Sequence, residues 1–219
     1  MPNDQFESIL GIDEAGRGCV LGDILLAGVT ANKNQRKELT KIGCMDSKKF
    51  GSGLTAFKAR KVLSQQINQI CEVFYEAENA ETIDQYVKNN QLNLLERQMA
   101  QRIIKKAKFD KALIDGKNIF LPLAKQNSKI LAIAKADQKY VTVAAASIIA
   151  KHQRDQKILE FFDNLGANFN EFKFKGWGYI NHQTFEFVKK FYLIKGKLPD
   201  NLRKSYQWQN LHKWLANKV

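Results

Sequence analysis

Short apolar runs separated by polar stretches predict a set of β-strands along the chain. Two of these runs, residues 6–13 and 24–30, lie near the N-terminus and are joined by a glycine-rich turn. Three more, residues 70–75, 111–115 and 129–134, stand between segments with helical patterns. The hydrophobic pattern therefore predicts five strands.

Apolar residues recur at helical spacing in the segments between and after these strands. A helix that opens at Thr55 has Ala59, Val62, Leu63 and Ile67 along one face. The same spacing predicts four more helices, at residues 80–87, 92–106, 143–162 and 183–191. Strands first, then helices interleaved with strands, then a helical tail indicate an α/β fold with a mixed central sheet flanked by helices.

The charge of the chain changes this picture more than its hydrophobic content does. A hydrophobic fraction of 44% and a charged fraction of 26% over 219 residues are ordinary for a globular protein with a sizeable core. In contrast, 35 Lys and Arg against 22 Asp and Glu give a net charge of +13. This excess favours a polyanionic partner such as nucleic acid, or it reflects a lysine-rich proteome.

Several classes of protein are not expected from this sequence. The first eight residues do not resemble a signal peptide, and no apolar run reaches the roughly 18 residues of a membrane span. Cys19, Cys44 and Cys71 are widely spaced, which predicts free thiols in a reducing cytoplasm and no zinc site. The histidines are equally scattered. Carboxylates would therefore hold any bound metal, which favours Mg²⁺ or Mn²⁺.

Candidate chemistry begins where the first strand ends, in the octet Gly-Ile-Asp-Glu-Ala-Gly-Arg-Gly. Strand side chains alternate between faces, so Asp13 and Glu14 can serve one site only where the strand ends or is distorted. Gly16 and Gly18 permit a sharp turn there, with Arg17 between them. Two acids, a turn and a base indicate metal ligands beside a phosphate or sugar contact; a charged strand-to-loop junction is the alternative.

Two further acids are placed to join Asp13. Asp115 follows three apolar residues and precedes a glycine, which puts its carboxylate at the tip of a buried strand. In the long helix that follows, an Ala-Ala-Ala-Ser segment allows close approach to the sheet, and Ser147, Lys151 and Asp155 share one face. The alternatives are that Asp115 serves only its turn and that Asp155 forms a surface ion pair.

Asp13, Glu14, Asp115 and Asp155 would together form a cluster of four carboxylates. Their mutual repulsion would raise at least one pKa. Two divalent ions would relieve this repulsion and would hold both the attacking and the leaving oxygen of a phosphodiester. The acids therefore indicate a nuclease that needs no protein nucleophile.

These motifs stand in the order found in type 2 ribonuclease H, which the chain resembles from about residue 8 to residue 206. The octet and the Ala-rich helix segment are the most specific of them. The motifs that follow the octet are Asp-Ser-Lys-Lys at 46–49, Asn-Leu-Leu at 93–95, Ile-Asp-Gly at 114–116, Ala-Ala-Ala-Ser-Ile-Ile-Ala-Lys at 144–151 with Arg-Asp at 154–155, and Lys-Gly-Trp-Gly at 175–178.

The resemblance implies an RNase H-like catalytic domain over residues 1–165 and a helical C-terminal cap over residues 166–219 that contributes to duplex binding. It implies an endonuclease, dependent on two Mg²⁺ or Mn²⁺ ions, that cuts the RNA strand of RNA–DNA hybrids. It also implies cleavage 5′ of ribonucleotides embedded in duplex DNA, with 3′-hydroxyl and 5′-phosphate ends, and hence ribonucleotide removal. A cytoplasmic monomer with no membrane contact is expected.

Carried over position by position, the resemblance implies three groups of site residues. The catalytic, metal-binding acids are Asp13, Glu14, Asp115 and Asp155. Gly16, Arg17 and Gly18 match the loop that recognises the ribose 2′-hydroxyl, the group that separates RNA from DNA. The other expected substrate contacts are Asp46, Ser47, Lys48, Lys49, Ser147, Lys151, Lys175 and Arg203.

The chain also departs from the family pattern. Cys19 and Asp23 stand where relatives usually have proline, and Trp177 and Tyr179 replace the tyrosine and threonine of the common Lys-Gly-Tyr-Gly-Thr. Relatives use a C-terminal tyrosine that stacks on a sugar beside the cleavage point, and Tyr192, the nearest candidate, is out of register. A hybrid-only ribonuclease H and a non-catalytic nucleic-acid-binding relative are the alternatives.

Overall fold

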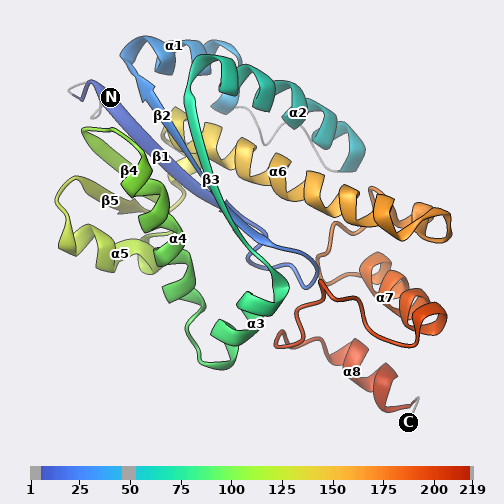
Figure 1. The fold of residues 1–219 in the computed structure, drawn as a ribbon. Coiled ribbons are helices and arrows are strands. Elements are labelled where there is room, and N and C mark those ends of the chain that lie inside the picture. Colours follow the sequence, from blue (N-terminus) through green and yellow to red (C-terminus); the bar gives the residue numbers. More distant parts are fainter. Residues whose placement is uncertain (1–5, 46–52, 218–219) are drawn as a thin grey trace.

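A computed structural model describes residues 6–45 and 53–217 of the chain (Figure 1). The expected substrate contacts Asp46, Ser47, Lys48 and Lys49 lie outside the described residues. One mixed sheet has helices on both faces, and the C-terminal helices lie at one end of it (Figure 1). This confirms the predicted α/β fold. Within the described ranges, no helix is both long and apolar enough to cross a membrane.

The sheet has five strands in the order β3-β2-β1-β4-β5. They are β1 (Ser8–Ala15), β2 (Ile24–Asn32), β3 (Glu72–Glu78), β4 (Lys111–Asp115) and β5 (Ile130–Ile133). The pairs β1–β2 and β2–β3 are antiparallel, whereas β1–β4 and β4–β5 are parallel. All five predicted strands are therefore present, with small shifts at their ends.

The parallel register of β1 and β4 brings two predicted acids to one edge of the sheet. Ile12 of β1 lies beside Ile114 of β4. The next residues along the two strands are Asp13 and Asp115, so both carboxylates follow paired positions. This is the arrangement that the strand-tip pattern predicts.

Helices cover the two faces of the sheet in two groups (Figure 1). α1 (Lys33–Lys41), α2 (Gly53–Ile70) and α6 (Val141–Leu165) form one group. α3 (Ala80–Lys88), α4 (Leu92–Lys106) and α5 (Lys117–Gln126) form the other. Neighbouring residues of β2 point to opposite faces, so Leu25 packs in a core with Ile149 of α6 and Leu26 in a second core with Ile103 of α4.

α6 lies unusually close to β1 because small residues line the contact. A Cβ atom added at Gly11 would lie 2.3 Å from the carbonyl carbon of Thr142. The side chains of Ala144, Ala145 and Ala146 are buried in the same contact region. The predicted close approach of the Ala-rich helix to the sheet is therefore confirmed, and it brings α6 side chains to the strand ends.

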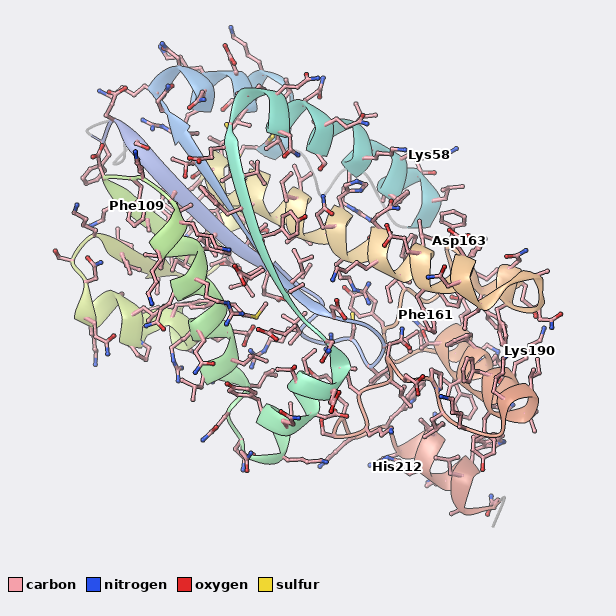
Figure 2. All side chains as sticks on the ribbon, in the orientation of Figure 1. Lys58, Phe109, Phe161, Asp163, Lys190 and His212 are labelled. Atoms are coloured by element: carbon pink, nitrogen blue, oxygen red, sulfur yellow. The ribbon has the colours of Figure 1, made fainter. Side chains whose placement is uncertain are left out.

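The C-terminal segment packs against α6 and against the loop that follows β1. It contains η3 (Ala167–Phe172), α7 (His182–Lys195) and α8 (Gln209–Ala216). Val20 and Leu21 of that loop share one core with Ile158 of α6 and Phe187 of α7. Figure 2 labels Phe161 at this contact, and its ring centroid lies 5.9 Å from that of Phe187.

The hydrophobic pattern misses some helices and misplaces one side chain. It does not predict α1, α5 or α8. α1 begins with a capping box between Asn32 and Gln35, and α5 contains Pro122. Val62, expected on the apolar face of α2, is 55% exposed. The buried face of α2 contains Leu63 and Ile67, as expected, together with Phe57.

Candidate active site

Two carboxylates meet at the edge where β1 and β4 end. Asp13 is 7% exposed and accepts a hydrogen bond from the backbone N–H of Glu14 at 2.8 Å. Burial raises the pKa of Asp13 to about 7, and the charge of Asp115 adds to this effect, while Ser147 and Lys151 oppose it. A buried carboxylate beside a second carboxylate is stabilised by added positive charge. The strand ends therefore form a site suited to a cation.

α6 supplies polar partners for this pair. The Ser147 hydroxyl is hydrogen-bonded to Asp13 and accepts a hydrogen bond from Lys151 Nζ at 2.8 Å. Ser147 is 2% exposed, so in this structure it supports Asp13 and does not reach the surface. Lys151 is exposed, and its charge lowers the pKa of Asp13 and of Glu14. The predicted shared face of Ser147 and Lys151 is confirmed.

Glu14 connects the acids to the loop formed by Gly16, Arg17 and Gly18, called the glycine loop below. Gly16 has a φ of +97°, and a Cβ there would lie 2.6 Å from the carbonyl oxygen of Asp23, so only glycine fits this turn. The turn directs the N–H of Arg17 to Glu14 Oε2 at 3.1 Å. Burial raises the pKa of Glu14, and the N–H and the charge of Arg17 act against that rise.

The side chain of Arg17 ties the glycine loop to α4. Its Nη2 donates to Asn93 Oδ1 at 2.8 Å. Its Nη1 forms an ion pair with Glu96, whose side chain is fully buried. The Asn-Leu-Leu motif of α4 thereby has a physical role that the sequence alone does not show: it anchors the arginine of the loop.

Arg203, expected as a substrate contact, lies beneath the loop. It is 2% exposed, and burial lowers the pKa of its guanidinium. Its Nε donates to the Gly22 carbonyl oxygen at 2.9 Å and its Nη1 to that of Gly16 at 2.7 Å. With its side chain enclosed in this way, Arg203 has no surface to offer a duplex. The expectation is therefore corrected: Arg203 holds the backbone of the loop.

Asp155 has surroundings unlike those of Asp13. Its Oδ2 accepts from Arg60 Nη2 at 2.8 Å and its Oδ1 from Arg154 Nη1 at 3.0 Å. Arg154 also donates to the Leu21 carbonyl oxygen at 3.2 Å. Both oxygens of Asp155 are thus engaged by arginines, and the resulting ion pairs link α2, α6 and the loop after β1.

A short helix contacts Asp115 through the residue that precedes a further acid. In η2 (Ala136–Gln138), the N–H of Ala136 donates to Asp115 Oδ1 at 2.7 Å. The next residue is Asp137, which is half-buried. The sequence offers only the signal of an Asp shortly after a predicted strand. The contact depends on a turn at Lys135, whose φ is +55°, and spacing alone cannot predict that turn.

The acids as placed do not form a closed metal site. Among residues 6–45 and 53–217, no group of three or more acidic, histidine or cysteine side chains is placed to hold a metal ion. The predicted cluster of four carboxylates is therefore not assembled in the described structure. The pair Asp13 and Asp115 is present; Glu14 follows Asp13, and Asp137 follows the residue whose N–H contacts Asp115. A cavity of about 410 Å³ opens beside Asp115, bordered by Lys117 of α5.

Comparison with known sequences shows the family of this chain. The sequence model of the family Ribonuclease HII matches residues 10–210. The chain is 32% identical over 199 residues to the Ribonuclease HII of Archaeoglobus fulgidus, covering 88% of this chain and 90% of that protein. It is 34% identical over 207 residues to the Ribonuclease HII of Methanothermobacter thermautotrophicus, covering 90% and 95%.

Solved structures give the same result. Ribonuclease H2 from Pyrococcus horikoshii has a TM-score of 0.78 at 27% identity, over 96% of this chain and 98% of that one. Archaeoglobus fulgidus RNase HII, solved in a complex with PCNA, has a TM-score of 0.76 at 30% identity, over 92% and 96%. The fold and these matches define a nuclease of the ribonuclease H class. Within that class, the chain belongs to the ribonuclease HII family and is a type 2 ribonuclease H endonuclease acting on RNA–DNA hybrids.

Proposed function

We propose that this ribonuclease H is dependent on a divalent metal and that it also cuts 5′ of ribonucleotides embedded in duplex DNA. Cleavage would leave 3′-hydroxyl and 5′-phosphate ends, and the physiological role would be removal of ribonucleotides from DNA. The observation that carries the proposal is the buried Asp13 beside Asp115, with a pKa raised to about 7, next to an open glycine loop. A cation site and a sugar site would thus lie side by side.

The metal would be Mg²⁺ or Mn²⁺; Asp13 and Asp115, which lie together in the structure, would hold it, and Glu14 would join them as a third ligand on binding. Carboxylate oxygens suit these hard ions, and the raised pKa of Asp13 reflects a charge that a cation would offset. Asp137, beside the residue that contacts Asp115, is the candidate for a fourth acid. When bound, the metal supplies positive charge at the phosphate and lowers the pKa of the attacking water. A more distant fold relative, Bst-RNase HIII, has been solved with Mn²⁺ at 19% identity and a TM-score of 0.74.

The remaining polar groups would orient these acids and the substrate. Ser147 fixes the carboxylate of Asp13, and the exposed ammonium of Lys151 is available to a phosphate of the cut strand. Asp155, expected as the fourth metal-binding acid, would instead hold Arg60 and Arg154 in place. The assignment separates Asp13, which faces another acid, from Asp155, which faces two bases.

Recognition of the ribonucleotide would fall to the glycine loop. Gly18 is exposed, and a Cβ there would meet no atom within 4 Å. The fold itself therefore does not require glycine at this position, in contrast to Gly16. A ligand that approaches the backbone would require it, because backbone groups could then reach a 2′-hydroxyl without obstruction. Arg17, tied to α4, would hold the loop in position.

Basic side chains of the C-terminal segment would hold the duplex. Lys175 is exposed in a loop that contacts the residues after the glycine loop: the Gly178 carbonyl oxygen accepts from the N–H groups of Val20 at 2.8 Å and Leu21 at 3.1 Å. Lysines in this position would neutralise backbone phosphates, so binding would weaken as salt increases.

A second candidate is a hybrid-only ribonuclease H with weak recognition of the RNA-to-DNA junction. The ring of Trp177 stacks on Phe57, with centroids 5.9 Å apart and an angle of 27°. Tyr192 packs against Trp214 at 5.5 Å, which places it in the α7–α8 contact. Tyr192, the nearest candidate for the junction tyrosine, and Trp177, which stands where relatives have a tyrosine, are thus both engaged within the protein, and this observation favours the second candidate.

Cleavage of two labelled duplexes tests the proposal and separates the candidates. One duplex carries a single ribonucleotide in DNA, and the other has a continuous RNA strand on DNA; each is tested with Mg²⁺, with Mn²⁺ and with EDTA. The proposal predicts metal-dependent cleavage of both, with a cut directly 5′ of the lone ribonucleotide. Cleavage of only the continuous hybrid would favour the second candidate. Cleavage that persists in EDTA would contradict the proposed metal site.

A further inference from the structure

Two side chains of the C-terminal segment donate hydrogen bonds to the carbonyl groups of the glycine loop. Arg203 Nη1 donates to the carbonyl oxygens of Gly16 at 2.7 Å and of Arg17 at 3.2 Å, and the Tyr206 hydroxyl donates to that of Arg17 at 2.7 Å. Arg203 also donates to the Tyr206 hydroxyl at 3.1 Å, and its guanidinium lies 5.2 Å from the Tyr206 ring centroid. Arg203 and Tyr206 therefore act as one support under the loop.

A carboxylate of α3 holds the middle of the segment that carries this support, and the Arg203 N–H, which donates to the Val20 carbonyl oxygen at 2.8 Å, holds its start. Asp84 is 9% exposed. Its Oδ2 accepts from the Lys204 N–H at 2.9 Å, and its Oδ1 accepts from the Ser205 N–H at 3.0 Å and from Ser205 Oγ at 2.5 Å. Hydrogen bonds to a charged acceptor are stronger than neutral ones. Asp84 thus fixes the two residues that lie between Arg203 and Tyr206.

We propose that Asp84 is a positioning residue for ribonucleotide recognition. It fixes the segment at residues 203–206, whose two side chains set the carbonyl groups of Gly16 and Arg17 and so leave Gly18 facing the substrate. The inference rests on the proposed recognition of the 2′-hydroxyl by the glycine loop. It extends that site to a helix that contributes no group to the acids or to the loop itself.

The physical cause of the coupling is the loss of three hydrogen bonds to one charged acceptor. Without the Asp84 carboxylate, the N–H groups of the exposed Lys204 and the half-buried Ser205 lose this acceptor and must bond to water. The segment would move to reach water, and Arg203 and Tyr206 would move with it. A displacement of about 1 Å at a recognition loop is enough to lower the rate strongly.

The variants Asp84→Asn and Ser205→Ala test this coupling by weakening the Asp84 hydrogen bonds to different extents. Asn retains one oxygen acceptor and removes the charge, whereas Ser205→Ala removes only the hydroxyl bond. Glu81→Gln is the matched control, because Glu81 is an exposed acid on the same helix. The first readout is hydrogen exchange of the amides at residues 17–22, which needs no activity. The second is the ratio of cleavage at a single ribonucleotide to cleavage of the continuous hybrid.

The expected result is graded. Asp84→Asn should speed exchange at residues 17–22 by about tenfold and lower the cleavage ratio by about tenfold, as expected for weakened charged hydrogen bonds. Ser205→Ala should change both in the same direction by about threefold. Glu81→Gln should change neither. A purely structural role would lower both cleavage rates together and would leave their ratio unchanged.

Two results would overturn the proposal. Unchanged exchange at residues 17–22 in both variants would show that Asp84 does not fix the loop. Faster exchange with an unchanged cleavage ratio would show that the loop position does not govern recognition. A wild-type enzyme that does not cut at single ribonucleotides would count against the proposed function and against recognition by this loop, while hydrogen exchange would still decide whether Asp84 holds the loop.

Discussion

The strand-end acids and the glycine loop are neighbours, yet their charged side chains have opposite surroundings. Asp13 is buried next to Asp115, and its pKa is raised to about 7. In the loop, Arg17 is paired with the buried Glu96, and beneath the loop Arg203 donates to the backbone carbonyl groups of Gly16 and Gly22. The acids would gain from an added cation, whereas both arginines already have acceptors in the protein.

This difference shows that the type of a charged residue does not by itself reveal its role. A carboxylate that faces another carboxylate is held in an unfavourable state and is suited to binding a cation. A carboxylate such as Asp155, between Arg60 and Arg154, contributes to the architecture instead. The charged partner of each group distinguishes the two cases.

The largest effect should follow from neutralising the strand-end acids. Asp13→Asn and Asp115→Asn should each lower the cleavage rate by about a thousandfold or more, because the proposed cation loses a ligand. Hybrid binding, measured by fluorescence anisotropy, should stay within about threefold of wild type. The control is Asp163→Asn, an acid on α6 whose side chain is 61% exposed. Wild-type rates in either variant would contradict the site assignment.

The next effect should come from the support beneath the loop. Arg203→Met should lower the free energy of unfolding by on the order of 3 kcal/mol, because the Gly16 and Gly22 carbonyl groups lose a charged donor. Urea unfolding measures this change. Lys204→Met, at an exposed neighbouring position, is the control and should change stability little. Equal stability of the two variants would show that the buried guanidinium contributes nothing.

A smaller effect is expected on the pH dependence of stability. The pKa of Asp13 is about 7 in the folded protein and 3.8 as a reference, so between these values the folded state holds a proton that the unfolded state has released. In EDTA, Asp13 therefore makes the free energy of unfolding fall as pH rises from about 4 to about 7. Asp13→Asn should be more stable than wild type at pH 8 by on the order of 2 kcal/mol, and this difference should vanish near pH 4. An equal difference at both pH values would contradict the raised pKa.

The smallest effect should come from one exposed lysine. Lys175→Ala should lower hybrid affinity a few-fold and reduce the slope of log affinity against log salt by about one. Anisotropy titrations at several salt concentrations measure both quantities. Lys58→Ala, at an exposed site on α2 that Figure 2 labels, gives a comparison for loss of a surface charge. An unchanged slope would show that Lys175 contacts no phosphate.

The strand ends could be predicted from the sequence because local rules determine them. Alternation of side chains, short apolar runs and glycine turns place Asp13 and Asp115 at strand tips, and the parallel register of β1 and β4 brings them together. The close approach of α6 likewise follows from its run of small residues. The strand tips and the run of small residues are each encoded by residues that are near one another in the chain, and the contacts between β1, β4 and α6 then follow from the fold.

Other features depend on contacts between distant segments, and no local sequence pattern predicts those contacts. Arg203 is a basic residue in a basic segment, and only the packing of that segment under Gly16 shows that it is buried. Asp155 shares a helical face with Ser147, but partners from α2 and α6 determine its role. Helix α5 is concealed in the sequence by Pro122, which the fold tolerates.

Titration of Mn²⁺ into the wild-type protein, Asp13→Asn and Asp155→Asn, followed by calorimetry, tests the central claim most directly. The account predicts that wild type and Asp155→Asn bind the ion with similar affinity and that Asp13→Asn loses measurable binding. Thermal unfolding of each variant, measured in the same buffer, checks that each variant is folded under the conditions of the titration. Loss of binding in Asp155→Asn with retention in Asp13→Asn would contradict the account.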